Sequence, residues 1–167
     1  KINHHDGDDP HIWTDPVLVK IQAKNKTEAL SQKFPKNSEL YARNLEKFSN
    51  ILDELDADIK SRLSGLKSNK FAVYHPSWGY FAARYGLEQI PIETEGKEPK
   101  PADLKRLIKQ IKDENIKVVF VSPWASKKSA KAIADQTNSE VVEVDHLCED
   151  WLKQSEEIVK IFEKYFK

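Results

Sequence analysis

The stretch VVFVSPWASKKSAKAIADQTNSEVVEV, residues 118–144, places two short apolar runs on either side of an alanine-rich segment. The runs 118–121 and 141–144 are rich in β-branched valine, which is typical of buried strands. The segment 126–136 opens on Ser126 and predicts a short helix. A strand, a helix and a second strand in this order imply a right-handed crossover between parallel strands. This stretch therefore favours a parallel sheet covered by helices.

The same alternation of strands and helices continues on both sides of this stretch. Strand-like runs occur at 71–74 (FAVY) and 88–92 (EQIPI), and helical patterns with one apolar face occur at 101–114 and 149–166. The sequence thus predicts an α/β fold with a mainly parallel four-stranded sheet covered by helices.

Two helices are expected before the sheet. Asp15 followed by Pro16 is typical of a helix start, and this helix should end near Phe34. From 38 to 66, apolar residues recur at spacings of three and four, which predicts one amphipathic helix. At 1.5 Å per residue it would be roughly 40 Å long, which is more than a domain of this size needs.

The composition excludes several classes of protein. The 167 residues carry 27 Lys and Arg against 27 Asp and Glu, so no basic surface indicates a nucleic-acid partner. No apolar run approaches the roughly 20 residues that span a bilayer. The chain has no Met and begins at Lys1 within a polar segment, so we expect a processed or truncated piece. The single Cys148 cannot form an internal disulfide.

Polar side chains follow two of the predicted strands. His75 comes directly after the run 71–74, and Asp145 comes directly after the run 141–144. Because parallel strands end at one edge of a sheet, these side chains can meet there, and imidazole with carboxylate suits a divalent metal ion. The alternatives are a hydrogen-bonded structural histidine and an Asp145 that caps the following helix.

The N-terminal stretch HHDGDDPHIWTDP, residues 4–16, is rich in histidine and aspartate. His11 is a third candidate ligand, and the alternative is a loop histidine stacked on a neighbouring aromatic ring. His4 and His5 are expected in a mobile loop over residues 1–10, where a short His-rich tract could bind metal weakly.

Four segments resemble the zinc- and manganese-specific solute-binding proteins of ABC transporters, in that family's order. They are DPHIWTDP, VYHPSWGYFAARYGL, KEPKPADLKRLIKQIKDENIKVVFVSP and VVEVDHLCEDWLKQSEEIVKIF. The resemblance covers nearly the whole chain and implies the C-terminal lobe of a two-lobed binding protein whose N-terminal lobe is missing. It also implies a periplasmic location, or an extracellular membrane-tethered lipoprotein, and a membrane permease as partner.

The resemblance divides the chain into four parts. These are a mobile His/Asp-rich loop (1–10), a metal-motif segment with the first helix (11–37), a long inter-lobe helix (38–66) and the C-terminal α/β lobe (67–167). Without the other lobe, the inter-lobe helix would expose apolar surface, so we expect the fragment to self-associate.

Three residues match ligand positions of the family, namely His11, His75 and Asp145. Together with an imidazole from the missing lobe they favour Zn²⁺, with Mn²⁺ as the alternative, because manganese-type members commonly have a carboxylate where His75 stands. The chain departs from the family at Ser122 and Trp124, where members often have Glu and Gln.

Three functions stay open from the sequence. The resemblance favours zinc capture by a protein that is not an enzyme. The second is a binding protein of the same fold for manganese, a metal chelate or an organic solute. The third is a zinc-dependent hydrolase in which Glu149 or Glu143 acts as the base.

Overall fold

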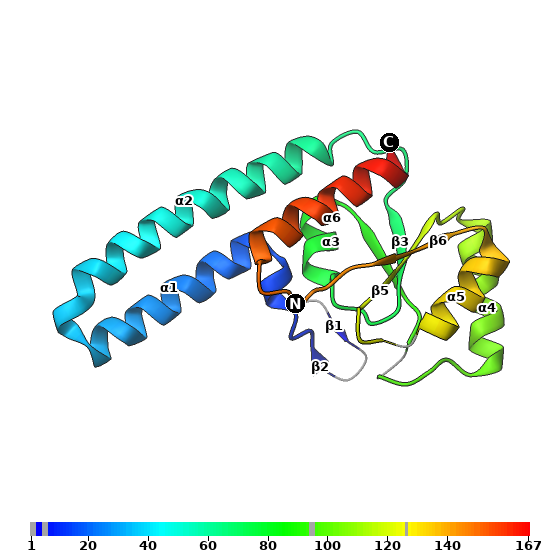
Figure 1. The fold of residues 1–167 in the computed structure, drawn as a ribbon, viewed down its shortest axis with the longest axis horizontal. Coiled ribbons are helices and arrows are strands. Elements are labelled where there is room, and N and C mark those ends of the chain that lie inside the picture. Colours follow the sequence, from blue (N-terminus) through cyan, green and yellow to red (C-terminus); the bar gives the residue numbers. More distant parts are fainter. Residues whose placement is uncertain (1–2, 5–6, 94–95, 126) are drawn as a thin grey trace.

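The computed structural model describes residues 3–4, 7–93, 96–125 and 127–167 (Figure 1). A long helical hairpin projects from one side of an α/β part, and the chain end marked C lies where the hairpin returns to that part (Figure 1). Two helices followed by four strands and four helices confirm the predicted fold class.

The N-terminal segment holds β1 (Asn3–His4) and β2 (Gly7–Asp8), an antiparallel pair where the sequence predicts only a loop. The elements that follow are η1 (Ile12–Thr14), α1 (Pro16–Lys33), η2 (Pro35–Asn37), α2 (Ser38–Arg62), β3 (Lys70–Val73), α3 (Gly79–Tyr85), β4 (Glu88–Pro91), α4 (Pro101–Asp113), β5 (Val118–Val121), α5 (Lys127–Thr137), β6 (Glu140–Glu143) and α6 (Trp151–Phe166). The helices and strands predicted from residue patterns are all present, with ends shifted by a few residues.

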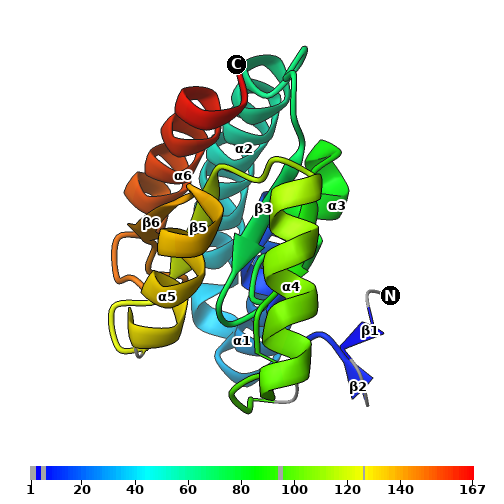
Figure 2. The same ribbon diagram turned by 90° about the vertical axis from the view of Figure 1, so that its right-hand side faces the viewer.

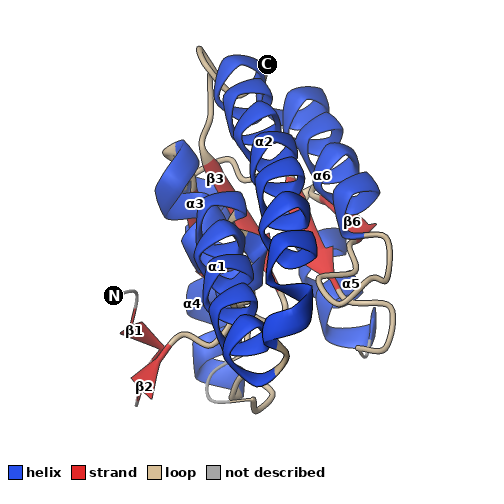
Figure 3. Cartoon of the chain, turned by 90° about the vertical axis from the view of Figure 1, so that its left-hand side faces the viewer, coloured by secondary structure: helices blue, strands red, loops and turns tan. Residues whose placement is uncertain are grey.

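The main sheet has the order β4-β3-β5-β6, and all its strands run parallel. From β3 the chain continues to β4 at one edge of the sheet, and from β5 it continues to β6 at the other edge. The carboxyl ends of β3 and β5 therefore flank the point where the strand order reverses, which is where open α/β sheets bind ligands. Helices α4 and α5 cover one face, and α3 and α6 cover the other together with α2 (Figures 2 and 3).

The core between the sheet and α6 is aromatic. The Phe162 ring lies 5.1 Å from Phe71, 5.3 Å from Phe166, 5.5 Å from Phe120 and 5.8 Å from Phe81, measured between ring centroids. All five side chains are almost completely buried. This cluster joins α6 to β3, β5 and α3, so it holds the two central strands of the sheet against these helices.

The hairpin of α1 and α2 is anchored at its near end only. Ile59 of α2 is fully buried against the aromatic core, whereas large apolar side chains toward the far end are exposed. Asp15 caps α1 by accepting hydrogen bonds from the backbone N–H groups of Val17 and Leu18, as its position before Pro16 predicts. Within the described residues, no helix is both long enough and apolar enough to cross a membrane.

We predict that Phe162→Ala lowers the free energy of unfolding by about 3–5 kcal/mol, because it leaves a cavity among four packed rings. Ile21→Ala is the matched control: Ile21 on α1 is 52% exposed, and its truncation should cost no more than about 0.5 kcal/mol. Denaturant unfolding followed by circular dichroism measures both values. Equal losses would contradict the central role of the aromatic cluster.

Candidate metal centre

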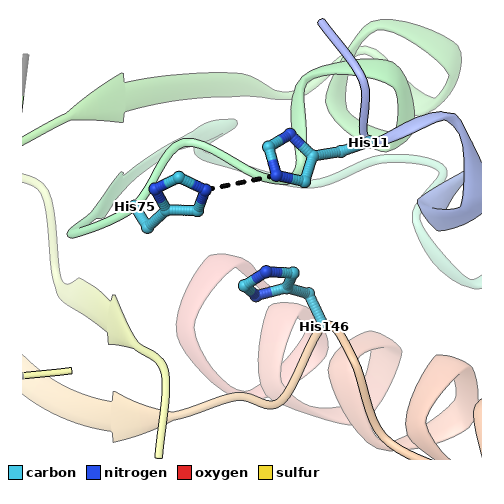
Figure 4. Close-up of side chains that lie close together, drawn as sticks. All are labelled: His11, His75 and His146. Atoms are coloured by element: carbon cyan, nitrogen blue, oxygen red, sulfur yellow. Dashed lines mark hydrogen bonds between the residues drawn. The ribbon is translucent and has the colours of Figure 1, made fainter. Parts of the chain in front are cut away.

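Three histidines from distant parts of the chain meet at the carboxyl edge of the sheet (Figure 4). His75 follows β3, His146 follows β6, and His11 is the residue before η1. The ring centroids of His11 and His75 lie 5.1 Å apart, and each lies 5.6 Å from the centroid of His146. The cluster thus combines two strand ends with the N-terminal segment.

The spacing of the ring nitrogens suits one bound ion. One nitrogen from each of the three rings lies within 4.8 Å of the other two, and Nε2 of His11 lies 3.2 Å from Nε2 of His75. Two imidazoles on a tetrahedral zinc ion, with bonds of 2.0–2.1 Å, have nitrogens about 3.4 Å apart. His11 and His75 already have nearly this separation, and a small movement of His146 would supply a third corner.

Burial sets the charge of this cluster. His11 and His146 are each only 7% exposed, whereas His75 is partly open to solvent. The pKa of His146 is lowered to about 4, mainly by desolvation and also by the nearby His11 and His75. His146 is therefore neutral near pH 7, which is the form that binds a metal ion.

Hydrogen bonds tie the N-terminal segment onto the sheet edge. The indole N–H of Trp13 donates to the carbonyl of His146 at 2.8 Å, and the indole N–H of Trp151 donates to the carbonyl of Trp13 at 2.8 Å. The Tyr80 hydroxyl donates to the carbonyl of Asp9 at 3.1 Å. These bonds to α3, α6 and the loop after β6 hold His11 over the other two histidines.

An ion pair strengthens the same attachment. Arg84 of α3 donates from Nε to Asp15 at 2.6 Å, and the Asp15 side chain is only 3% exposed. The contact with Asp15 raises the pKa of the Arg84 guanidinium above its ordinary value. The start of α1, directly after the His11 segment, is thereby fixed to the α/β part.

The Nδ1 atom of each histidine faces a polar partner. Asp9 Oδ1 lies 2.7 Å from His11 Nδ1, and Ser122 Oγ lies 3.3 Å from His146 Nδ1. Glu93 Oε1 is in direct hydrogen-bond contact with His75 Nδ1. His11 and His75 thus turn their Nε2 atoms toward each other.

The structure brings together His11 and His75, two of the three ligands predicted from the sequence. Among the described residues, Asp145 is not part of this group: its carboxylate accepts a hydrogen bond from the backbone N–H of Leu147 at 2.8 Å. This bond shapes the turn after β6. A ligand role for Asp145 stays a prediction, and His146 takes the third position in the cluster.

The other candidates named from the sequence are not members of this described group. His5 falls outside the described residues, and of His4 only the backbone, in β1, is described. Within the described part of the chain, Glu143 and Glu149 are not members of the histidine group either. The geometry therefore points to a site built from three imidazoles.

Strand alternation is the signal that could have identified His146. Val73 of β3 and Val144 after β6 both pack in the core beneath α6. Two residues further on, His75 and His146 have the same parity and face the same side, where the His11 segment lies. Asp145 has the opposite parity. A carboxylate is a good ligand for a divalent metal ion, and this chemistry favoured Asp145 in the sequence analysis. The alternation of side chains along a strand, with a period of two residues, favours His146 instead.

Two exposed apolar side chains border the cluster. Trp124 is 57% exposed, and its ring centroid lies 5.3 Å from that of His146. Leu147, the next residue in the chain, is 60% exposed. Apolar surface beside a polar cluster is typical of a face that another protein part covers.

Comparison with known proteins gives consistent matches. The family model described as zinc-uptake complex component A, periplasmic, matches residues 1–165. The high-affinity zinc uptake system protein ZnuA of Bacillus subtilis is 33% identical over 130 residues, which cover 77% of this chain and 41% of that protein. A putative metal-binding protein of Chlamydia trachomatis is 33% identical over 143 residues, covering 85% of this chain and 52% of the relative.

Solved structures agree with the fold. A crystal structure of ZnuA superposes with a TM-score of 0.92 at 39% identity and covers 95% of this chain and 60% of that one. A ZnuA deletion mutant with zinc bound gives a TM-score of 0.92 at 38% identity, and the alignment covers 97% of this chain and 62% of the mutant chain. The chain thus spans about half the length of the proteins it matches.

We predict that His146 of the metal-free protein titrates near pH 4 instead of 6.5, as its lowered pKa implies. The unfolded chain binds this proton more readily, so the free energy of unfolding should fall as pH decreases from about 6.5 toward 4. NMR titration of the imidazole resonances, assigned with His146→Gln, measures the pKa. The variant should lose this part of the pH dependence of unfolding, and a wild-type His146 that titrates at 6.5 or above would contradict the prediction.

Proposed function

Because this chain belongs to the family of periplasmic zinc-uptake component A proteins, we propose that it is the C-terminal part of a zinc-capture protein. The observation that carries the proposal is the convergence of His11, His75 and His146 with their ring nitrogens within 4.8 Å of one another. The ion is then handed to the membrane permease of an ABC transporter. The location is the periplasm, or the outer side of the membrane with a lipid anchor.

The ligand set supports zinc as the cargo. Three neutral imidazoles suit a borderline ion such as Zn²⁺ better than Mn²⁺, which prefers oxygen ligands. Replacing the expected Asp145 by His146 in the cluster strengthens this preference. A zinc site takes about four ligands, so a fourth is expected from the rest of the protein. With four protein ligands no position stays open for activated water, which supports capture without catalysis.

The hairpin supports a role as one part of a larger protein. The exposed large apolar side chains on α1, α2 and the turn between them are Ile21, Leu30, Phe34, Leu40 and Ile51. The relatives extend well beyond the matched region, as this chain covers 41% and 52% of two of them. We assign the hairpin surface to packing against the remainder of the protein, which also covers the histidine edge.

We predict that His75→Ala and His146→Ala each weaken zinc binding by more than the 10- to 100-fold typical of an indirect partner, since each removes a direct ligand. Competition with a chelator of known affinity measures the loss. Asp145→Asn tests the remaining ligand prediction: a comparable loss would make Asp145 a ligand, whereas little change would assign it to the turn. Asp113→Asn, an exposed carboxylate on α4, is the control.

X-ray anomalous scattering recorded above and below the zinc absorption edge locates the ion directly. The expected result is a peak among His11, His75 and His146. A peak elsewhere, or zinc affinity unchanged in all three histidine variants, would overturn the proposed function.

We also predict that the isolated chain associates in solution through the apolar hairpin surface. Light scattering should give a mass above 19.3 kDa that rises with concentration. The double variant Ile21→Glu/Leu30→Glu should reduce this mass, because it places charges on the apolar surface. Asn25→Glu adds a charge at an exposed polar position of α1 and serves as control; a monomer at all concentrations would contradict the prediction.

A further inference from the structure

The histidine cluster is supported by two carboxylates that the sequence patterns did not single out. We propose that Asp9 and Glu93 are positioning residues that hold the proton of His11 and His75 on Nδ1 and present Nε2 to the ion. This inference rests on the proposed function for the identity of the ion. It adds the groups that decide which nitrogen binds and how the rings are oriented.

Asp9 is built into the segment that carries His11. Its Oδ1 accepts the backbone N–H of His11 at 2.9 Å and lies 2.7 Å from Nδ1 of the same residue. The Asp9 side chain is fully buried, and its backbone carbonyl accepts a hydrogen bond from the Tyr80 hydroxyl. Asp9 is thus held through both its carboxylate and its backbone carbonyl, which restricts the orientation of the His11 ring.

Glu93 plays the same part for His75 from a different element. It lies just beyond β4, and its backbone N–H donates to the carbonyl of Tyr74 at 3.1 Å, so it is fixed to the end of β3. Its side chain is only 11% exposed, and Oε1 contacts His75 Nδ1. The parallel pairing of β3 with β4 therefore aligns the carboxylate with the histidine.

Proton positions follow from the chemistry of the two partners. A carboxylate only accepts hydrogen bonds, so each contacting Nδ1 carries the hydrogen and each Nε2 keeps its lone pair. With both hydrogens on Nδ1, the 3.2 Å contact between the two Nε2 atoms, which Figure 4 draws as a hydrogen bond, has no hydrogen between its atoms. Their lone pairs repel until a cation lies between them. The pair His11 and His75 is thus arranged for a cation before one arrives, and the carboxylates maintain that arrangement.

The third histidine provides an internal comparison. Nδ1 of His146 faces Ser122 Oγ at 3.3 Å, a neutral and longer contact. A hydroxyl both donates and accepts, so it does not select one tautomer of His146. The loss of Ser122 should therefore affect the cluster less than the loss of either carboxylate.

The test compares Glu93→Ala, Glu93→Gln, Asp9→Asn and Ser122→Ala in the complete protein. Long-range ¹H–¹⁵N NMR of the metal-free protein at about pH 8 reports which imidazole nitrogen carries the hydrogen. We expect Nδ1–H at His11 and His75 in the wild type, and a mixture of tautomers at His75 in Glu93→Ala. Glu93→Gln keeps an accepting amide oxygen and should retain Nδ1–H.

Zinc affinity, measured by chelator competition, is the second readout. Glu93→Ala should lose about 10- to 100-fold, the range typical of partners that orient a ligand, and Asp9→Asn, which keeps an accepting amide oxygen, should lose less than Glu93→Ala. Glu93→Gln should fall between wild type and Glu93→Ala, and Ser122→Ala should lose less than either carboxylate variant. Glu98→Gln, a carboxylate bonded to Ser129 and not to a histidine, should match the wild type in both readouts.

Two results separate this inference from the proposed function. Unchanged His75 tautomer and zinc affinity in Glu93→Ala would overturn the positioning role, even if the wild type binds zinc. Wild-type protein that binds no zinc would overturn the proposed function, while the tautomers of the metal-free variants would still decide whether Asp9 and Glu93 orient the rings.

Discussion

The parallel pairing of β3, β5 and β6 places the ends of three strands along one edge, and the candidate site depends on this edge. His75 and His146 leave the sheet there on the side of α6, and Ser122 follows β5 between them. Because β5 lies between β3 and β6, two strand spacings of roughly 4.8 Å each separate their ends, a distance that two histidine side chains can bridge toward one ion. The packing of Phe162 beneath the strands keeps this edge in register with the helices.

The N-terminal segment completes the edge only because several bonds hold it there. A polar segment rich in aspartate has little apolar area to bury, so packing alone would not fix His11. Indole donors from Trp13 and Trp151, with the ion pair of Asp15 and Arg84, supply directional attachment instead. These bonds reach α3, α6 and the loop after β6, so several elements of the α/β part meet at the site.

The sequence predicted the sheet and its helices from local periodicity, and His75 from its place directly after a strand. His11 was predicted from the His/Asp-rich N-terminal stretch and from the family resemblance. The sequence predicted Asp145 where the structure brings in His146, since the chemistry of a carboxylate outweighed the parity set by Val144. Glu93 could not be found this way. Its contact with His75 depends on the register between two strands and on a loop conformation, and neither leaves a pattern in the sequence.

Charge balance gives a physical reason for the arrangement of the cluster. Three neutral imidazoles around Zn²⁺ would leave two positive charges in a site where His11 and His146 are each 7% exposed. Burying such a charge is costly unless opposite charge lies close. Asp9 and Glu93 each place a carboxylate behind a histidine ring, on the side away from the ion. Their two negative charges offset the two positive charges of Zn²⁺, so the zinc-bound cluster approaches neutrality without a carboxylate ligand. On this argument a site of histidines alone can hold a divalent ion at this edge, and the carboxylates behind the rings carry the charge that a direct ligand such as Asp145 would otherwise supply.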